Sequence, residues 1–139
     1  MTQECDMIDP VMSFFTEQGY CSFPEVPLGQ KRVDLLFVYP NFPRMIAVEL
    51  KVRDWRQAFR QALQDKFCAH NVYAAIWHET IPRIDRALFH RYGIGVLDVD
   101  QNFVKEDIVP RRCTLGLTAS MKRILSDLQD RSDKPFMWV

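Results

Sequence analysis

Residues 48–52, which read Val-Glu-Leu-Lys-Val, constrain the fold most because they have the pattern of a strand but carry two charges. Successive side chains of a strand point to opposite faces, so Glu49 and Lys51 share one face and the three apolar side chains share the other. A charged side chain on a buried strand costs free energy unless it is paired, hydrated or bound to an ion. This stretch therefore predicts a strand that contributes to a site.

A second acid, Asp34, lies in another apolar run of strand length, residues 32–38. Turn-forming residues 39–44 separate this run from residues 45–52, so the simplest prediction is an antiparallel hairpin. If Val38 pairs with Met45, counting back along both strands brings Asp34 directly opposite Glu49, on the same face. A slip of one residue would move the two carboxylates apart.

The remaining apolar patterns predict a mixed sheet with helices around it. Asp9 and Pro10 are typical of a helix start, and Gln3 to Ile8 could add a further helical piece. We expect helices at residues 10–18, 53–69, 81–92 and 117–128, and further strands at 20–26, 72–77, 93–99 (after a turn) and 103–109. The predicted fold class is α/β, in a single domain that spans residues 1–139.

Composition excludes some classes of function. The chain of 139 residues has 18 basic and 18 acidic side chains, so nucleic-acid binding would need a local basic patch. The sequence has no apolar run of membrane-spanning length and no signal-peptide pattern, so we expect no membrane partner. The 4 cysteines form no C-x-x-C pair, which argues against a zinc site and favours free thiols in a reducing cytoplasm.

Two carboxylates and one lysine on neighbouring strands are typical of metal-assisted hydrolysis. Magnesium (Mg2+) prefers carboxylate oxygens, water and substrate phosphate, and a bound metal ion lowers the pKa of its water. A nearby lysine can stabilise charge that develops on a phosphoryl group. The chain shows no nucleophile elbow and no phosphate-binding glycine loop. The structural alternative is a solvent-facing edge, or an ion pair between Asp34 and Lys51 without function.

Asp34, then Glu49-Leu50-Lys51 across a hairpin, then an amphipathic helix, resembles the PD-(D/E)xK nuclease superfamily. The resemblance implies a restriction-endonuclease-like mixed central sheet flanked by helices, and hydrolysis of phosphodiester bonds, in DNA above other substrates. It implies that Asp34, Glu49 and the Leu50 carbonyl bind Mg2+, which Mn2+ could replace, and that Lys51 positions the attacking water. Val33 stands where relatives have a proline, which has no metal-binding side chain.

Many members of this superfamily also place an acid on the first helix and a glutamine on the helix after the Glu-x-Lys strand. The resemblance implies Glu4 as the acid, with Glu17 and Glu25 as alternatives. It implies Gln61 as the glutamine, on the polar side of the predicted helix.

Basic residues flank both acidic strands and could form a rim that binds nucleic-acid phosphates. They are Lys31, Arg32, Arg53, Arg56 and Arg60. The alternative function is a nuclease-fold module with weak or no chemistry that binds nucleic acid or a protein partner. A nuclease of this size could act as a homodimer or with a targeting subunit.

Overall fold

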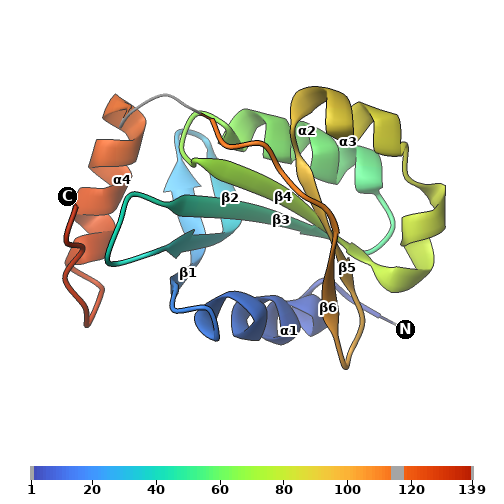
Figure 1. Ribbon diagram of the computed structural model, residues 1–139, viewed down its shortest axis with the longest axis horizontal. Coiled ribbons are helices and arrows are strands. Elements are labelled where there is room, and N and C mark those ends of the chain that lie inside the picture. Colours follow the sequence, from blue (N-terminus) through green and yellow to red (C-terminus); the bar gives the residue numbers. More distant parts are fainter. Residues whose placement is uncertain (1, 114–117, 139) are drawn as a thin grey trace.

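A six-stranded mixed β-sheet organises the computed structural model, which describes residues 2–113 and 118–138 (Figure 1). Its elements are α1 (Cys5–Thr16), β1 (Cys21–Leu28), β2 (Lys31–Val38), β3 (Met45–Lys51), α2 (Trp55–Asp65), β4 (Asn71–Trp77), the 3-10 helix η1 (His78–Arg83), α3 (Arg86–Tyr92), β5 (Gly95–Val99), β6 (Val104–Ile108) and α4 (Ala119–Gln129). None of these helices is both long and apolar enough to cross a membrane.

The strands follow one another across the sheet in chain order, β1 to β6. Both β1–β2 and β2–β3 are antiparallel, β3–β4 and β4–β5 are parallel, and β6 returns antiparallel to β5. The two parallel crossovers run through α2 and through η1 with α3. The predicted α/β class and mixed sheet flanked by helices are therefore confirmed.

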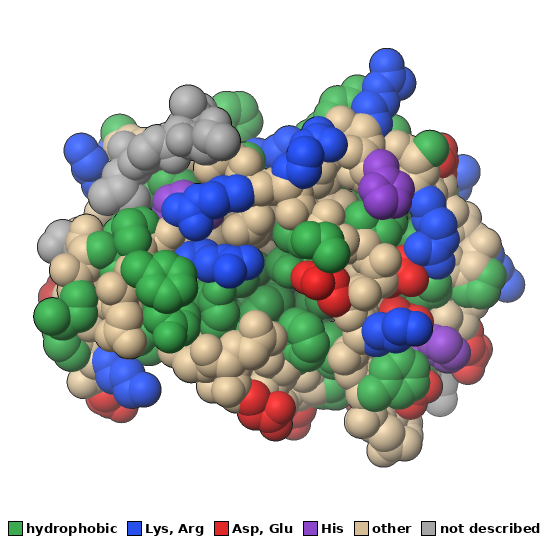
Figure 2. All heavy atoms as spheres, viewed as in Figure 1, with side chains coloured by type: hydrophobic (Ala, Val, Ile, Leu, Met, Phe, Trp, Pro, Cys, Tyr) green, Lys and Arg blue, Asp and Glu red, His purple; other side chains and the backbone are tan. Residues whose placement is uncertain are grey.

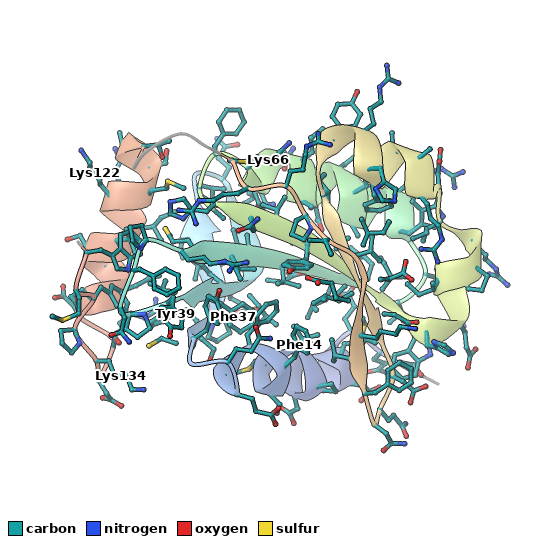
Figure 3. The ribbon with its side chains drawn as sticks, in the orientation of Figure 1. Phe14, Phe37, Tyr39, Lys66, Lys122 and Lys134 are labelled. Atoms are coloured by element: carbon teal, nitrogen blue, oxygen red, sulfur yellow. The ribbon has the colours of Figure 1, made fainter. Side chains whose placement is uncertain are left out.

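Helices cover both faces of the sheet (Figure 1). On one face α1 packs Met7, Val11 and Phe15 against β2 and β3, and the Phe15 and Phe37 rings lie 4.4 Å apart. Figure 3 shows Phe37 on this side of the sheet, close to Phe14 of α1. The opposite face, called here the α2 face, carries α2 and α3. Helix α4 lies beside the edge strand β1.

The predicted hairpin register is confirmed. Val38 pairs with Met45, and the ladder continues to the pair of Leu35 and Val48. Asp34 and Glu49 are the next residues in this register. Because Ala47 packs on the α2 face and side chains alternate along a strand, Glu49 and Lys51 also belong to that face.

The first helix begins earlier than predicted, at Cys5, and contains Pro10 in its interior. The Asp6 carboxylate accepts a hydrogen bond from the Gln3 backbone N–H at 2.8 Å and so stabilises the first turn. Pro10 has no N–H to donate to the Asp6 carbonyl, which costs one helical hydrogen bond. Packing of the fully buried Met7 and Val11 against the sheet compensates for this loss.

Two further helix predictions were wrong in their limits. The expected helix at 81–92 is two pieces, because Pro82 lies in η1 and Asp85 caps α3 by accepting a hydrogen bond from the Leu88 N–H. The helix expected to reach Ala69 ends at Asp65, which leaves the Phe67 side chain 71% exposed. Leu117, the expected first residue of the last helix, lies outside the described residues.

The start of β5 depends on a residue without a side chain. A Cβ atom on Gly95 would lie 2.7 Å from Cδ1 of Tyr73 and 2.8 Å from Cδ of Pro110. We predict that Gly95→Ala lowers the free energy of unfolding by about 1–3 kcal/mol, because the buried Tyr73 ring has little room to move. Chemical denaturation would measure this change.

The control is Gly29→Asn, since Gly29 has a φ of +62° and no atom within 4 Å of the added Cβ. Asparagine tolerates this left-handed conformation, so the loss should stay below about 1 kcal/mol. Equal losses in the two variants would contradict the packing argument at Gly95.

Candidate functional site

Three carboxylates meet on the α2 face of the sheet. Glu49 of β3 and Asp65 of α2 are both 0% exposed. Asp34 of β2 lies beside Glu49, and its Oδ2 accepts a hydrogen bond from the Leu50 N–H at 2.8 Å. This bond joins β2 to β3 just beyond their last ladder pair and holds Asp34 against Glu49.

The Lys31 ammonium joins two of these acids. Its Nζ lies 2.7 Å from Asp65 Oδ1 and 3.3 Å from Glu49 Oε2, and it donates to the Gln61 carbonyl at 3.3 Å. Lys31 was predicted to contact nucleic-acid phosphates, and the structure instead points its ammonium at the carboxylates. We call Lys31, Asp34, Glu49 and Asp65 the acid cluster.

Burial dominates the electrostatics of the acid cluster. It raises the pKa of Asp34 to about 6, although the Leu50 N–H opposes the shift and Glu49 adds to it. Burial also raises the pKa of Glu49 to about 8, with further contributions from the hydrogen bond and charge of Asp65. Burial lowers the pKa of Lys31, but its bonds to Asp65 and Glu49 outweigh this effect and leave that pKa raised. Burial raises the pKa of Asp65 as well, so the pair formed by Glu49 and Asp65 keeps a proton more readily than free carboxyls do.

The three residues that contact Lys31 also carry other buried side-chain oxygens. Among the residues described, Glu49 Oε1, Asp65 Oδ2 and Gln61 Oε1 are buried and have no hydrogen-bond partner when both acids are ionised, whereas a proton on Glu49 lets that carboxyl donate to Asp65. Each such atom costs about 1–3 kcal/mol, more where it is charged. Carboxylate and amide oxygens are the ligands that hard cations such as Mg2+ prefer, so the chemistry of these atoms fits a divalent cation.

The arrangement of the side chains fits a metal ion less well than their chemistry does. In residues 2–113 and 118–138, no group of three or more His, Cys, Asp or Glu side chains is arranged to hold a metal ion. The ammonium of Lys31 instead lies against Glu49 and Asp65. A divalent cation shared by Asp34 and Glu49 would therefore require the acid cluster to rearrange.

The predicted catalytic lysine lies at the end of β3 and faces another acid. Lys51 Nζ forms an ion pair with Glu4 Oε1 at 3.1 Å, at the start of α1. The charge of Glu4 also raises the pKa of Asp34, so Glu4 lies near the acid cluster. No hydrogen bond or ion pair within the described residues joins the side chains of Glu17 or Glu25 to it.

The structure places Gln61 at the site, but it does not bring the predicted basic residues together. Arg53 lies next to Lys51, whereas the Arg56 guanidinium stacks 4.5 Å over the Trp55 ring. The other two arginines make local hydrogen bonds: Arg60 to Gln57, and Arg32 to the Glu25 carbonyl. Figure 2 shows Lys and Arg side chains distributed over the visible face, without one continuous basic patch.

Asp65 is the member of the acid cluster that the sequence prediction missed. The pattern of α2 contained a signal, because Asp65 falls on the same helical stripe as the buried Ala58 and Ala62. A carboxylate on an apolar stripe needs a buried partner. The partner, Lys31, comes from a distant strand, so the sequence pattern alone did not reveal the pair.

The acid cluster predicts a stability that falls as pH rises. The pKa of Glu49 is about 8 in the folded protein and 4.5 ordinarily, so the folded state binds this proton more tightly. The stabilisation from this proton is complete below the ordinary pKa of Glu49. It is lost as the pH rises through the pKa of Glu49 in the folded protein. We predict that Glu49→Gln loses less stability than wild type between about pH 5 and about pH 9, by roughly 1–3 kcal/mol.

Denaturation curves at a series of pH values measure this difference. Glu17→Gln, which removes an exposed carboxylate outside the acid cluster, should follow the wild-type pH profile. Parallel profiles for wild type and Glu49→Gln would contradict the proposed electrostatics.

Comparisons with known proteins identify a fold and no function. No protein-family model matches the chain, and no curated protein matches it. The structure is similar to SPO1766, a protein of unknown function from Silicibacter pomeroyi, with a TM-score of 0.72 and 18% identity over 96% of this chain and 93% of that one. At this identity the likeness supports the α/β fold alone.

Proposed function

We propose that this chain is a Mg2+-dependent nuclease of restriction-endonuclease-like fold that hydrolyses phosphodiester bonds in DNA. The observation that carries the proposal is the meeting of Asp34 and Glu49 across β2 and β3, with Lys51 on the same face. The following helix adds Gln61 at this point, and α1 adds Glu4. These residues correspond to the PD-(D/E)xK pattern that the sequence resembles.

The residues that would hold the metal are Asp34, Glu49 and the Leu50 carbonyl, with Mn2+ as an alternative ion. A bound divalent cation would supply a water of lowered pKa and neutralise charge on the phosphate. Asp34 is already aligned by the Leu50 N–H, which fixes the direction of its carboxylate. Loss of the proton that Glu49 shares with Asp65 would leave Glu49 Oε1 and Asp65 Oδ2 available to the metal ion.

Lys51 would position the attacking water and stabilise negative charge as the bond to phosphorus forms. Its partner Glu4 is a side chain at the exposed start of α1, and 48% of that side chain is accessible. The ion pair is therefore a surface pair of small stability, about 0–1 kcal/mol, and a substrate phosphate could replace Glu4 beside the ammonium.

A cleavage assay tests the proposal. Wild type should cleave plasmid or single-stranded DNA in Mg2+ or Mn2+ and lose activity in EDTA. Asp34→Asn, Glu49→Gln and Lys51→Ala should each reduce cleavage on the order of 100-fold or more, because each removes a metal-binding or charge-stabilising group. Lys122→Ala is the control, since Lys122 is an exposed side chain of α4 (Figure 3) with no hydrogen bond or ion pair to the described residues of the acid cluster. The proposal fails if wild type cleaves no faster than Asp34→Asn.

Lys31 should compete with the metal, because its ammonium already neutralises Glu49 and Asp65. We predict that Lys31→Met binds Mn2+ about tenfold more tightly than wild type, a change of about 1.4 kcal/mol. Without metal the variant should be less stable than wild type at high pH, because the ionised acids no longer have the Lys31 ammonium as a buried counter-ion. Isothermal titration calorimetry and thermal unfolding with and without Mn2+ measure both effects.

The result that would contradict this competition is weaker Mn2+ binding in Lys31→Met than in wild type. It would mean that Lys31 holds the carboxylates in the metal-binding arrangement. Lys134→Met, which removes an exposed ammonium of the C-terminal segment, should leave Mn2+ affinity unchanged.

A second candidate function is a module of the same fold that binds nucleic acid or a protein partner without catalysis. The position of Lys31 between Glu49 and Asp65 favours it, because an internal ammonium can satisfy these acids permanently. Such a module would bind DNA equally well after Asp34→Asn, and calorimetry would find no Mg2+ site.

A further inference from the structure

We propose that a groove at the carboxyl ends of β3 and β4 binds a phosphate of the DNA backbone through Arg53 and Arg83. This inference rests on the proposed nuclease function and adds a substrate-positioning surface to it. Arg83, on η1, comes from a segment that the sequence pattern did not connect with the site.

The groove consists of two adjoining cavities of about 480 and 300 Å³. Thr2, Val52 and Arg53 line both cavities. The smaller one also contains Lys51 and Glu4, and the larger one contains Arg83. Arg53 therefore lies between the candidate catalytic lysine and Arg83.

A buried hydrogen bond fixes η1 to the end of β3. The Thr80 hydroxyl donates to the Val52 carbonyl at 2.7 Å, and Thr80 is 4% exposed. Ile81 and Ile84 are buried on either side of Arg83, which anchors the backbone of this segment. The backbone of Arg83 is therefore fixed relative to Lys51, while the Arg83 side chain is exposed to solvent.

The groove offers two arginine side chains that no described protein group binds. Within residues 2–113 and 118–138 neither Arg53 nor Arg83 forms an ion pair or a side-chain hydrogen bond, whereas nearby Arg86 pairs with Asp107. The lining also holds three acids, which balance its three basic side chains: Glu4 pairs with Lys51, Asp54 caps α2, and Glu79 lies in the larger cavity. A planar guanidinium matches the oxygens of a phosphate in two-point hydrogen bonding.

The location also fits a substrate surface. Lys51 and Ile76 are partners in the parallel ladder of β3 and β4, so both strands end at one edge of the sheet. Ligands of open α/β sheets bind outside the carboxyl ends of parallel strands. Because Arg53 lines both cavities, a DNA backbone that follows the groove could contact Lys51 at one end and Arg83 at the other.

Fluorescence anisotropy with a labelled double-stranded DNA oligonucleotide in EDTA tests the groove without cleavage. Arg53→Gln and Arg83→Gln should each weaken binding about 3- to 10-fold and reduce the slope of log K against log salt by about 1. Arg83→Lys should restore part of the affinity, because it keeps the charge but loses the planar contact.

Lys122→Gln removes one positive charge from α4, at the end of the molecule opposite the yellow-green η1 segment (Figure 1), and should bind DNA as wild type does. Circular dichroism confirms that each variant is folded. The inference is overturned if folded Arg83→Gln binds DNA with the wild-type affinity and salt slope.

This outcome differs from failure of the nuclease proposal. Loss of DNA affinity in Arg83→Gln together with no cleavage by wild type would support the groove and overturn the catalytic role. Cleavage by wild type, with unchanged KM and DNA affinity in Arg83→Gln, would overturn the groove alone.

Discussion

The buried contact of Lys31 with Glu49 and Asp65 is the interaction on which the candidate site depends. Two carboxylates at 0% exposure would be strongly destabilising without a cation, and the ammonium lies 2.7 Å from one and 3.3 Å from the other. The contact also determines how three elements meet, because Lys31 comes from β2, Glu49 from β3 and Asp65 from the last turn of α2. One ammonium balances the pair while Glu49 holds its proton and hydrogen-bonds to Asp65, and a second cation is needed only when both acids are ionised.

The proton held by Glu49 connects stability to the proposed function. A buried acid with a raised pKa destabilises the folded protein at neutral and higher pH, and a divalent cation would relieve that cost. Among the described residues, Glu49 Oε1 and Asp65 Oδ2 have no partner once Glu49 loses the proton that it shares with Asp65. At the same end of β3, Lys51 and the groove with Arg53 and Arg83 would contact the substrate.

Local sequence patterns predicted the sheet and the meeting of Asp34 with Glu49. The alternation in β3 placed Glu49 and Lys51 on one face, and turn composition set the hairpin register that brings Asp34 beside Glu49. Long-range partners were not predictable in the same way: Lys31 was expected at a phosphate, and Asp65 was overlooked on an apolar stripe of α2. The position of Pro10 misled the prediction of the start of α1, because tertiary packing of Met7 and Val11 outweighs the lost hydrogen bond.

A crystal structure of the protein grown with Mn2+, using anomalous scattering to locate the ion, tests the central claim most directly. The account predicts an anomalous peak within ligand distance of Asp34 and Glu49, with the Lys31 ammonium moved away from Glu49. A well-ordered acid cluster that keeps Lys31 on both Glu49 and Asp65, with no anomalous peak beside Asp34 at saturating Mn2+, would contradict it.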